Sequence, residues 1–313
     1  MRVAGNSYTA SMVNQINLLT GRQYQLQNQA TTGQSITAPE DNPAGMTQAL
    51  GLETDNSNAA QYAQNISTLQ NHSTLIGNAL QQLKTIADRI NELATSSDGT
   101  ASPSALQANA VETTQLIKQA VNIMNSKDGG QYLFGGTSSG QPPFAMTTDA
   151  NGNVTGVSYQ GNTSVTENEI GQNSTIEVDA PGANDTGSGP RGVISDSRYG
   201  ADFFNHAISF QNDLLSGNTN AISTVDQPAL SKDDDNIIYQ VSNNAAVQSR
   251  LDVAASAVST QKTSLNTALT NVAGADLTQT LSQLTQTQNA YQIAMQSSAT
   301  ILQLRTSLLA YLP

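Results

Sequence analysis

Apolar and small residues recur along one stretch of the chain at alternating steps of four and three, without a missed step. The series comprises Tyr62, Ile66, Leu69, Ser73, Ile76, Leu80, Leu83, Ala87, Ile90 and Ala94. This spacing is the seam of a coiled coil and predicts one long helix over about residues 53–94. Such a helix is on the order of 60 Å long, since each residue adds about 1.5 Å.

Both ends of the chain carry the same alternation. Near the N-terminus it runs through Met12, Ile16, Leu19, Gln23, Leu26 and Ala30. Near the C-terminus it runs through Leu277, Leu281, Leu284, Gln288, Tyr291, Met295, Ser298, Leu302, Arg305, Leu309 and Leu312. Matching seams predict two terminal helices, so the chain folds back like a hairpin. They leave more apolar area than one pair of helices can bury, and we infer that neighbouring copies complete this core.

The central part of the chain predicts further helices around a β-rich insert. Ser102-Pro103 is typical of a helix start and predicts a helix to about Asn125. From residue 131 to about 198, short alternating runs punctuated by Gly, Asn and Pro predict strands, with a hairpin turn at Asn151-Gly152. The helical pattern resumes over residues 201–216, breaks across 226–235 and runs again over 237–272.

These elements predict a mainly α fold with a β-rich insert. Both chain ends form a folded-back coiled-coil bundle of long helices, and a small β domain lies in the middle of the sequence. The expected parts are terminal assembly helices at 1–38 and 277–313, a helical bundle at 39–144 and 201–276 with a β-hairpin near 131–144, and an acidic β-rich outer domain at 145–200.

The distribution of charge supports this division. Residues 145–240 contain thirteen acidic residues and only three basic ones, Arg191, Arg198 and Lys232. The termini are almost uncharged, and a segment that is polar through Gln, Asn, Ser and Thr can pack among helices without the cost of burying ions. We therefore expect the terminal seams to contact other subunits and the acidic insert to face water.

Composition excludes several classes of protein. The net charge of −12 disfavours nucleic acid as a partner, because a polyanion-binding surface needs the opposite sign. With no cysteine and only His72 and His206, neither a cysteine-based zinc site nor a multi-histidine metal cage is expected. No apolar stretch reaches the roughly 18 residues of a membrane span, and the N-terminus lacks the pattern of a Sec signal, so export would need another route.

Several short motifs occur in the order found in one family. Thr32-Gly33 precedes a turn at residues 39–45, and a glycine-flanked element at residues 129–137 contains Tyr132, Leu133, Phe134, Gly135 and Gly136, with Phe144 shortly after it. Further matches are at residues 157–162, 179–182, 247–251, 274–277 and 307–312. The chain resembles the flagellin superfamily, and within it most closely the family of type 3 hook-associated proteins. Gln34-Ser35 and Ala310 depart from the family pattern.

The resemblance implies a structural subunit without enzymatic activity or cofactor, located outside the cell at the junction between flagellar hook and filament. Its implied partners are other copies of itself in a ring-like layer, the lower hook-associated junction protein and flagellin. Export would use a cytoplasmic chaperone and the flagellar type III apparatus. The assembly residues expected from the seams are Met12, Ile16, Leu19, Leu26, Leu281, Leu284, Tyr291, Met295, Leu302, Leu309 and Leu312. For the element at residues 129–144 we expect Tyr132 and Phe134 to pack on the helices, and a contact between subunits through the same hairpin stays open.

Other motifs favour ordinary structural roles. Residues 136–140 match the G-x-S-x-G pattern of a hydrolase, but Pro142-Pro143 cannot open the helix that a nucleophile elbow needs. The residues from Asp149 onward imitate a calcium loop without its glycine and final glutamate, and a hairpin turn explains them better. Asp233-Asp234-Asp235 is interpreted as a solvated loop between helices, and His72 and His206 as ordinary helix residues.

Three alternatives to the junction subunit remain from the sequence. The first is a flagellin of the filament, which the shared termini permit. The second is a surface-displayed flagellin relative whose acidic β insert binds a glycan or other ligand. An enzyme is the weakest alternative, because no acid, base and nucleophile come together in the pattern.

Overall fold

The computed structural model describes the backbone of residues 2–97 and 99–309 and the side chains of residues 10–97 and 99–303. The chain divides into two compact units. Unit 1 comprises residues 1–60 and 260–313, and unit 2 comprises residues 61–259, so the division falls within two long helices.

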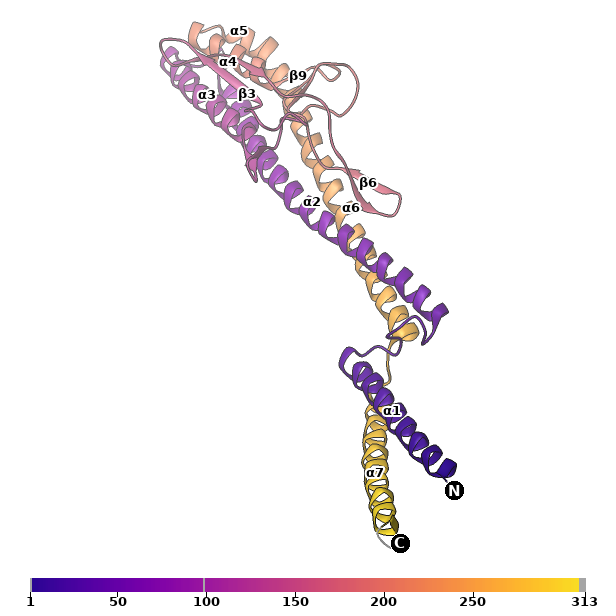
Figure 1. The fold of residues 1–313 in the computed structure, drawn as a ribbon. Helices are drawn as coiled ribbons and strands as arrows, with labels where there is room; N and C mark the ends of the chain where they lie inside the picture. The colour runs from indigo at the N-terminus through magenta and orange to yellow at the C-terminus, as the bar shows by residue number, and fades with distance from the viewer. Residues whose placement is uncertain (1, 98, 310–313) are drawn as a thin grey trace. The chain divides into compact units, whose positions relative to one another are not determined.

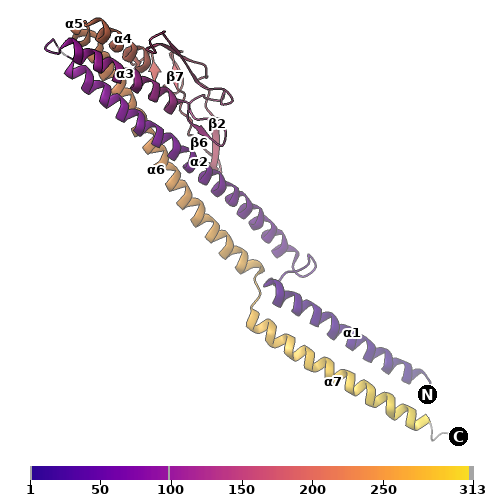
Figure 2. The same ribbon diagram turned by 90° about the vertical axis from the view of Figure 1, so that its left-hand side faces the viewer.

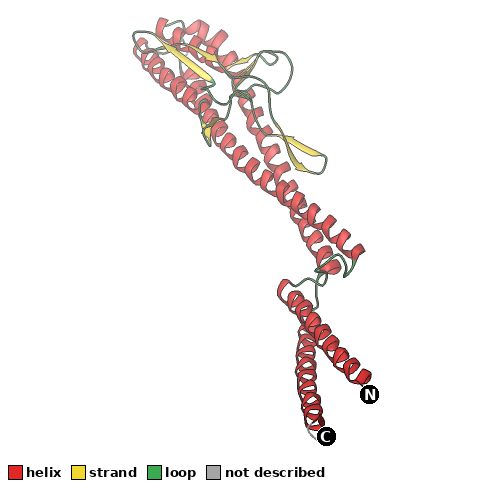
Figure 3. Ribbon diagram, viewed as in Figure 1, coloured by secondary structure: helices red, strands yellow, loops and turns green. Residues whose placement is uncertain are grey.

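Long helices dominate the secondary structure, as Figure 3 shows. The helices are α1 (Arg2–Thr32), α2 (Pro43–Ser96), α3 (Pro103–Met124), α4 (Phe203–Ser216), the short α5 (Thr219–Ala221), a π-helical turn at Ile222–Asp226, α6 (Gln227–Ala273) and α7 (Leu277–Leu309). The strands are β1 (Lys127–Asp128), β2 (Gln131–Tyr132), β3 (Phe144–Thr148), β4 (Val154–Tyr159), β5 (Glu167–Gly171), β6 (Ser174–Glu177), β7 (Ala183–Asn184), β8 (Ser195–Asp196) and β9 (Ala201–Asp202). The predicted fold class, mainly α with a small central β region, is confirmed.

Unit 1 contains the paired terminal helices. Helices α1 and α7 lie side by side and run in opposite directions, as Figures 1 and 2 show. The segment that follows α1 is joined to the segment that precedes α7 by backbone hydrogen bonds, from Ser35 N–H to the carbonyl oxygen of Ala273 at the end of α6 (2.6 Å) and from Ala275 N–H to Gly33 O (2.8 Å). Beside this link, a small apolar cluster fixes the ends of the connecting segments; it contains Ile36, Met46, Ala49, Leu269, Val272 and Ala273.

Unit 2 contains the main hydrophobic core. The predicted seam of α2 from Ile66 to Ala94 is buried throughout, with Leu83 and Ile90 at 0% exposure. Side-chain bonds pair Gln70 with Asp252 and Ser73 with Asn244, so α2 and α6 run antiparallel in this unit. The seam therefore serves as core within one chain.

The prediction that the long helix begins near residue 53 is wrong, because the helix begins about ten residues earlier. Helix α2 begins at Pro43, where proline suits the first helical position because its missing N–H needs no partner there. The Asn42 side chain accepts from Gly45 N–H (3.0 Å) and satisfies one of the free amides at the start. The periodicity of the apolar residues begins later than these start signals.

The predicted break across residues 226–235 is also wrong. Helix α6 begins at Gln227 and continues through all three aspartates to Ala273. Asp233 is fully buried, accepts from Asp202 N–H (2.7 Å) and lies 2.8 Å from Nδ1 of His206. Asp234 pairs with Lys84 (3.2 Å), so two of these aspartates have partners and the run is not a solvated loop.

The β-rich region consists of small antiparallel hairpins and one three-stranded sheet. Strands β3 and β4 form the hairpin predicted at Asn151-Gly152, and β5 pairs with β6. The hairpin predicted near residues 131–144, all of which the structure describes, is not formed, because β2 pairs with the preceding β1 and β3 pairs with β4. Strand β8 lies between β7, to which it is parallel, and β9. Asp149 accepts from the Asn151 and Asn153 amides, which is the geometry of a turn. Residues 136–140 lead into β3, and a nucleophile elbow requires a helix at that point.

Among the helices that the structure describes, none is both long and apolar enough to cross a bilayer.

Candidate assembly surfaces

The predicted seam of α1 faces α7 within the same chain. Leu26 is buried, and Met12, Ile16, Leu19, Gln23 and Ala30 are half-buried. The residues between them are mostly exposed, which is the pattern of a helix with one covered side. The structure thus brings the α1 seam residues together along one face.

The covered face of α7 differs from the predicted seam. It consists of residues at four-three spacing that are mostly small or polar: Thr280, Leu284, Thr287, Tyr291, Ala294 and Ser298. Of the predicted seam, Leu284 and Tyr291 lie on this face, whereas Leu281, Met295 and Leu302 are 53%, 46% and 52% exposed. The side chain of Leu309 and all of Leu312 lie outside the described residues.

Small side chains explain why this face of α7 packs on α1. Thr and Ala let helix backbones approach closely, and Thr287 satisfies its hydroxyl by donating to Gln283 O (2.7 Å) of the preceding turn. As a result, most of the large apolar side chains of α7 project away from α1. The exposed set is Leu277, Leu281, Ile293, Met295, Ile301 and Leu302, and α1 adds Val13, Leu18 and Tyr24.

The glycine-flanked element at residues 129–144 is built into the core of unit 2. Leu133, Phe134, Gly135 and Phe144 are buried, and Tyr132 is half-buried beneath Lys127, whose Nζ lies 4.4 Å from the ring centroid. The carbonyl oxygen of Phe134 accepts from the Tyr159 hydroxyl and from Gly182 N–H, both at 2.9 Å. These contacts tie the element to β4 and to the segment before β7.

Glycine is required at Gly136 for two reasons. Its φ of +62° is in the left-handed region, where side chains with a Cβ are strained. A Cβ at this position would also lie 2.3 Å from the carbonyl oxygen of Asn162. Close backbone approach therefore explains the glycine here.

Aromatic packing continues from this element into α4. The Phe144 ring lies 5.2 Å from that of Tyr159 and 5.4 Å from that of Phe204, centroid to centroid. Burial raises the pKa of Tyr159 to about 12, so its hydroxyl stays protonated and remains a donor even at a pH that ionises an exposed tyrosine. The motif thus packs the β-rich region against the helices of unit 2.

His72 is more than an ordinary helix residue. From α2 its Nδ1 lies 3.0 Å from Asp128 of β1 and its Nε2 3.2 Å from Asp179, which follows β6. The hydrogen bond with Asp179 is the main cause that raises the pKa of His72, against the effect of burial. Burial opposes the ionisation of Asp179, but bonds from His72 and the Thr166 amide outweigh it, and the pKa of Asp179 is lowered. We call this arrangement the His72 clamp.

The second histidine also has a buried acidic neighbour. The hydrogen bond with Asp233 raises the pKa of His206, although burial acts in the opposite direction. Nearby, burial raises the pKa of Asp226 to about 6, and one of its carboxylate oxygens has no hydrogen-bond partner in the described structure. Among the described residues, no group of acidic or histidine side chains has the arrangement of a metal site.

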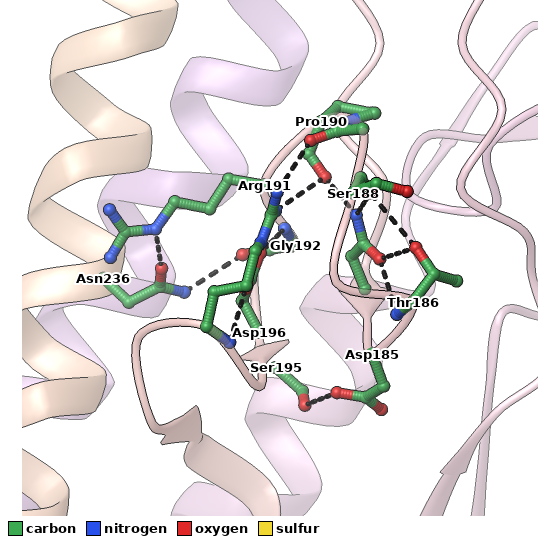
Figure 4. Close-up of polar contacts among 12 residues, drawn as sticks. Asp185, Thr186, Ser188, Pro190, Arg191, Gly192, Ser195, Asp196 and Asn236 are labelled. Carbon is green, nitrogen blue, oxygen red and sulfur yellow. Dashed lines mark hydrogen bonds and ion pairs between the residues drawn. The ribbon is translucent and has the colours of Figure 1, made fainter.

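A loop at residues 184–198 is held by buried polar side chains, as Figure 4 shows. Asn184 donates to Ser188 O (2.7 Å) and Pro190 O (2.6 Å), and Asn236 of α6 donates to Gly192 O and Val193 O. Asp196, also fully buried, pairs with Arg198 (2.6 Å). Four interior side chains, including Gln240, thus fix the backbone of this loop, whose residues 185–189 are exposed.

This loop presents Arg191 between two exposed tyrosines. The guanidinium carbon lies 3.6 Å from the ring centroid of Tyr199 and 4.3 Å from that of Tyr239. The side chain of Lys232, seven residues before Tyr239 on α6, borders Gly200 next to Tyr199. We call Arg191, Tyr199, Lys232 and Tyr239 the aromatic–basic patch. The patch was not predicted, although the three basic residues of the acidic region, Arg191, Arg198 and Lys232, were a signal for it in the sequence.

Comparison with known proteins gives consistent matches. Residues 3–139 match the family described as the bacterial flagellin N-terminal helical region. Flagellar hook-associated protein 3 of Salmonella typhimurium is 29% identical over 125 residues, which is 39% of this chain and 39% of that protein. The match thus spans about two fifths of the length of this relative.

Solved structures extend the likeness to most of the chain. A structure described as that of a flagellar hook-associated protein from Vibrio parahaemolyticus aligns with a TM-score of 0.63 and 16% identity, over 75% of this chain and all of that one. FlgL of Xanthomonas campestris aligns with a TM-score of 0.56 and 19% identity, over 70% of this chain and 99% of the other. At these identities the likeness establishes the fold. The resemblance predicted from the sequence motifs is confirmed, and the chain carries a flagellin-type N-terminal region within the fold of the flagellar hook-associated proteins.

Proposed function

We propose that this chain is a structural subunit of the bacterial flagellum, and that it forms the junction layer which joins the hook side to the flagellin filament. The proposal assigns it no catalytic step and no cofactor. Its work is mechanical, because packed long helices transmit torque between two tubes of different curvature. The match to a hook-associated protein and the fold support this assignment.

The observation that carries the proposal is the apolar surface of unit 1. The terminal helices form a layer only two helices thick, and large side chains such as Leu281 and Met295 are about half exposed on it. A soluble monomer rarely leaves so many large apolar side chains exposed together without using them for association. Each buried leucine contributes roughly 1.5–3 kcal/mol, so neighbouring subunits gain substantially by covering this surface.

The proposed partners follow from the place of the subunit. Other copies would complete a ring-like layer through the terminal helices, with the lower hook-associated protein on one side and flagellin on the other. We propose export through the flagellar type III apparatus with a cytoplasmic chaperone, and a final location outside the cell. The near absence of charge from residues 1–39 and 277–313 suits burial among the helices of such a tube.

The test is immunogold labelling of intact flagella with an antibody raised against residues 145–200. A single band where hook meets filament is the expected result. Label elsewhere on the cell and none on flagella would overturn the proposal. A deletion strain provides a second test: it should make hooks without attached filaments, and long filaments on its hooks would contradict the junction role.

A filament flagellin is the second candidate, because residues 3–139 match the flagellin N-terminal region itself. This candidate predicts label along the whole filament and a copy number far above that of the hook protein in sheared appendages. The junction subunit predicts a copy number no greater than that of the hook protein. Quantitative mass spectrometry of sheared flagella separates the two.

A further inference from the structure

We propose that the aromatic–basic patch of one copy binds the β5–β6 hairpin of a neighbouring copy, as a lateral contact within the layer. The inference deepens the proposed function and rests on it, since it names the surfaces through which copies meet. Both surfaces belong to unit 2 and therefore lie outside the terminal helices.

The patch has the residue types and the rigidity of an interface anchor. Arginine and tyrosine are enriched at the energetic centres of protein interfaces. Tyr199 and Tyr239 are about half exposed, and Arg191 lies between their rings. Its Nε donates to Asn236 (2.5 Å), so the side chain is already ordered and loses little entropy on binding.

The charge of the patch calls for a carboxylate. Within the described part of the chain neither Arg191 nor Lys232 forms an ion pair, whereas the charge of Arg198 is matched by Asp196. The chain has a net charge of −12, so Arg191 and Lys232 form a local positive surface beside exposed aromatic rings. Such a surface attracts an acidic surface of another chain.

The β5–β6 hairpin supplies such a surface. Glu167 is directly opposite Glu177 in the antiparallel register, and Glu169, two residues along β5, shares their face. Like charges directly opposite each other destabilise a hairpin. All three glutamates are exposed, and no described residue forms an ion pair with them; Arg250 lines the cavity beside the hairpin without doing so.

A second copy is therefore the occupant that the charges favour. The patch and the hairpin are different surfaces, so a contact in which one copy supplies the patch and the next copy supplies the hairpin is heterologous, and a heterologous contact can repeat into a ring or a helical layer. That is the geometry which a junction layer requires. The apolar faces of α1 and α7 then provide most of the binding energy between copies, and the contact between patch and hairpin sets how neighbouring copies are aligned.

Cross-linking tests the contact directly, because the natural chain contains no cysteine. A deletion strain co-expresses two full-length, differently tagged copies, one with Lys232→Cys and the other with Glu169→Cys. After oxidation of isolated flagella, a disulfide-linked dimer that carries both tags is expected. The matched control replaces Glu169→Cys with Thr148→Cys on exposed β3 and should give about tenfold less dimer, since proximity governs the yield.

Charge exchange provides an independent readout. Lys232→Glu should reduce incorporation into flagella about tenfold, and combination with Glu167→Lys and Glu177→Lys in the same chain should restore it. Incorporation at the junction without the cross-linked dimer, or unchanged incorporation of Lys232→Glu, would overturn the contact while leaving the proposed function intact. Failure of the wild-type chain to appear at the junction would overturn both.

Discussion

The two units contain the same four-three spacing and use it differently. In unit 2 the repeat on α2 is mostly Ile and Leu, with Ser73, Ala87 and Ala94 among them, and it is buried against the rest of the unit. In unit 1 the face of α7 that covers α1 contains Thr, Ala and Ser beside Leu284 and Tyr291, and large apolar residues such as Leu281 are left at the surface. The spacing thus identifies helices that have an apolar seam. The residue types on the covered side then decide whether that seam completes a core within the chain or stays available to other chains.

The contrast predicts the largest loss of stability in unit 2. Leu83→Ala should lower the free energy of unfolding by about 2–5 kcal/mol, because it leaves a cavity at a fully buried position. Urea denaturation followed by circular dichroism measures this loss. An effect below about 1 kcal/mol would show that the α2 seam is less tightly packed than its burial indicates.

A smaller loss is expected from Gly136→Ala. The new Cβ meets the Asn162 carbonyl at a backbone conformation that disfavours it, and strain of this kind costs about 1–3 kcal/mol. Gly140→Ala, on the same loop with open space around it, is the matched control and should change stability little. Equal melting temperatures for the two variants would contradict the close approach.

The His72 clamp should make a pH-dependent contribution that is smaller still. Because the folded pKa of His72 is raised, its contribution is fully present below the unfolded value near 6.5 and is lost as the pH rises through the folded pKa. The lowered pKa of Asp179 has the opposite pH dependence. The stability that the ionised Asp179 contributes is lost only as the pH falls through its folded pKa. The difference in stability between wild type and His72→Gln should therefore be larger at about pH 5.5 than at about pH 9. A difference that does not change with pH would show that the histidine acts only as a neutral hydrogen-bonding group.

The smallest effect on the isolated chain is expected in unit 1. Leu281→Asp and Leu302→Asp should each change the free energy of unfolding by no more than about 0.5 kcal/mol, since both positions are about half exposed. The same variants should block incorporation into flagella, because a carboxylate would be buried between subunits. Leu284→Asp, on the covered face, should also block assembly while unit 2 stays folded. Normal incorporation of all three would mean that the terminal helices are not a packing surface.

Much of the fold could be predicted from the sequence where a local signal was strong. The helix from Pro103 begins where Ser102 caps it, and the β3–β4 hairpin turns at Asn151-Gly152. Helices α1 and α7 follow the terminal repeats, although the repeat marks only part of α1.

The remaining errors have a common physical cause. A run of three aspartates reads as solvated, yet Asp233 is buried because His206 and the Asp202 amide compensate its charge from elsewhere in the chain. His72 looked ordinary because its partners, Asp128 and Asp179, are far along the sequence. The aromatic–basic patch likewise unites residues of a loop and of α6. Pairing between polar side chains that are far apart in the sequence produces no periodic pattern. These sites could therefore be identified only from the structure.

The link at residues 33–35 and 273–275 gives unit 1 a particular mechanical property. Here the chain passes twice between helices, once in each direction, and the two passages are joined by the backbone bonds at Ser35 and Ala275. Sliding or rotating one passage against the other would break these hydrogen bonds and uncover the apolar side chains of Ile36 and Ala273. The two passages therefore resist moving independently, so a load on either terminal helix is shared by both connections.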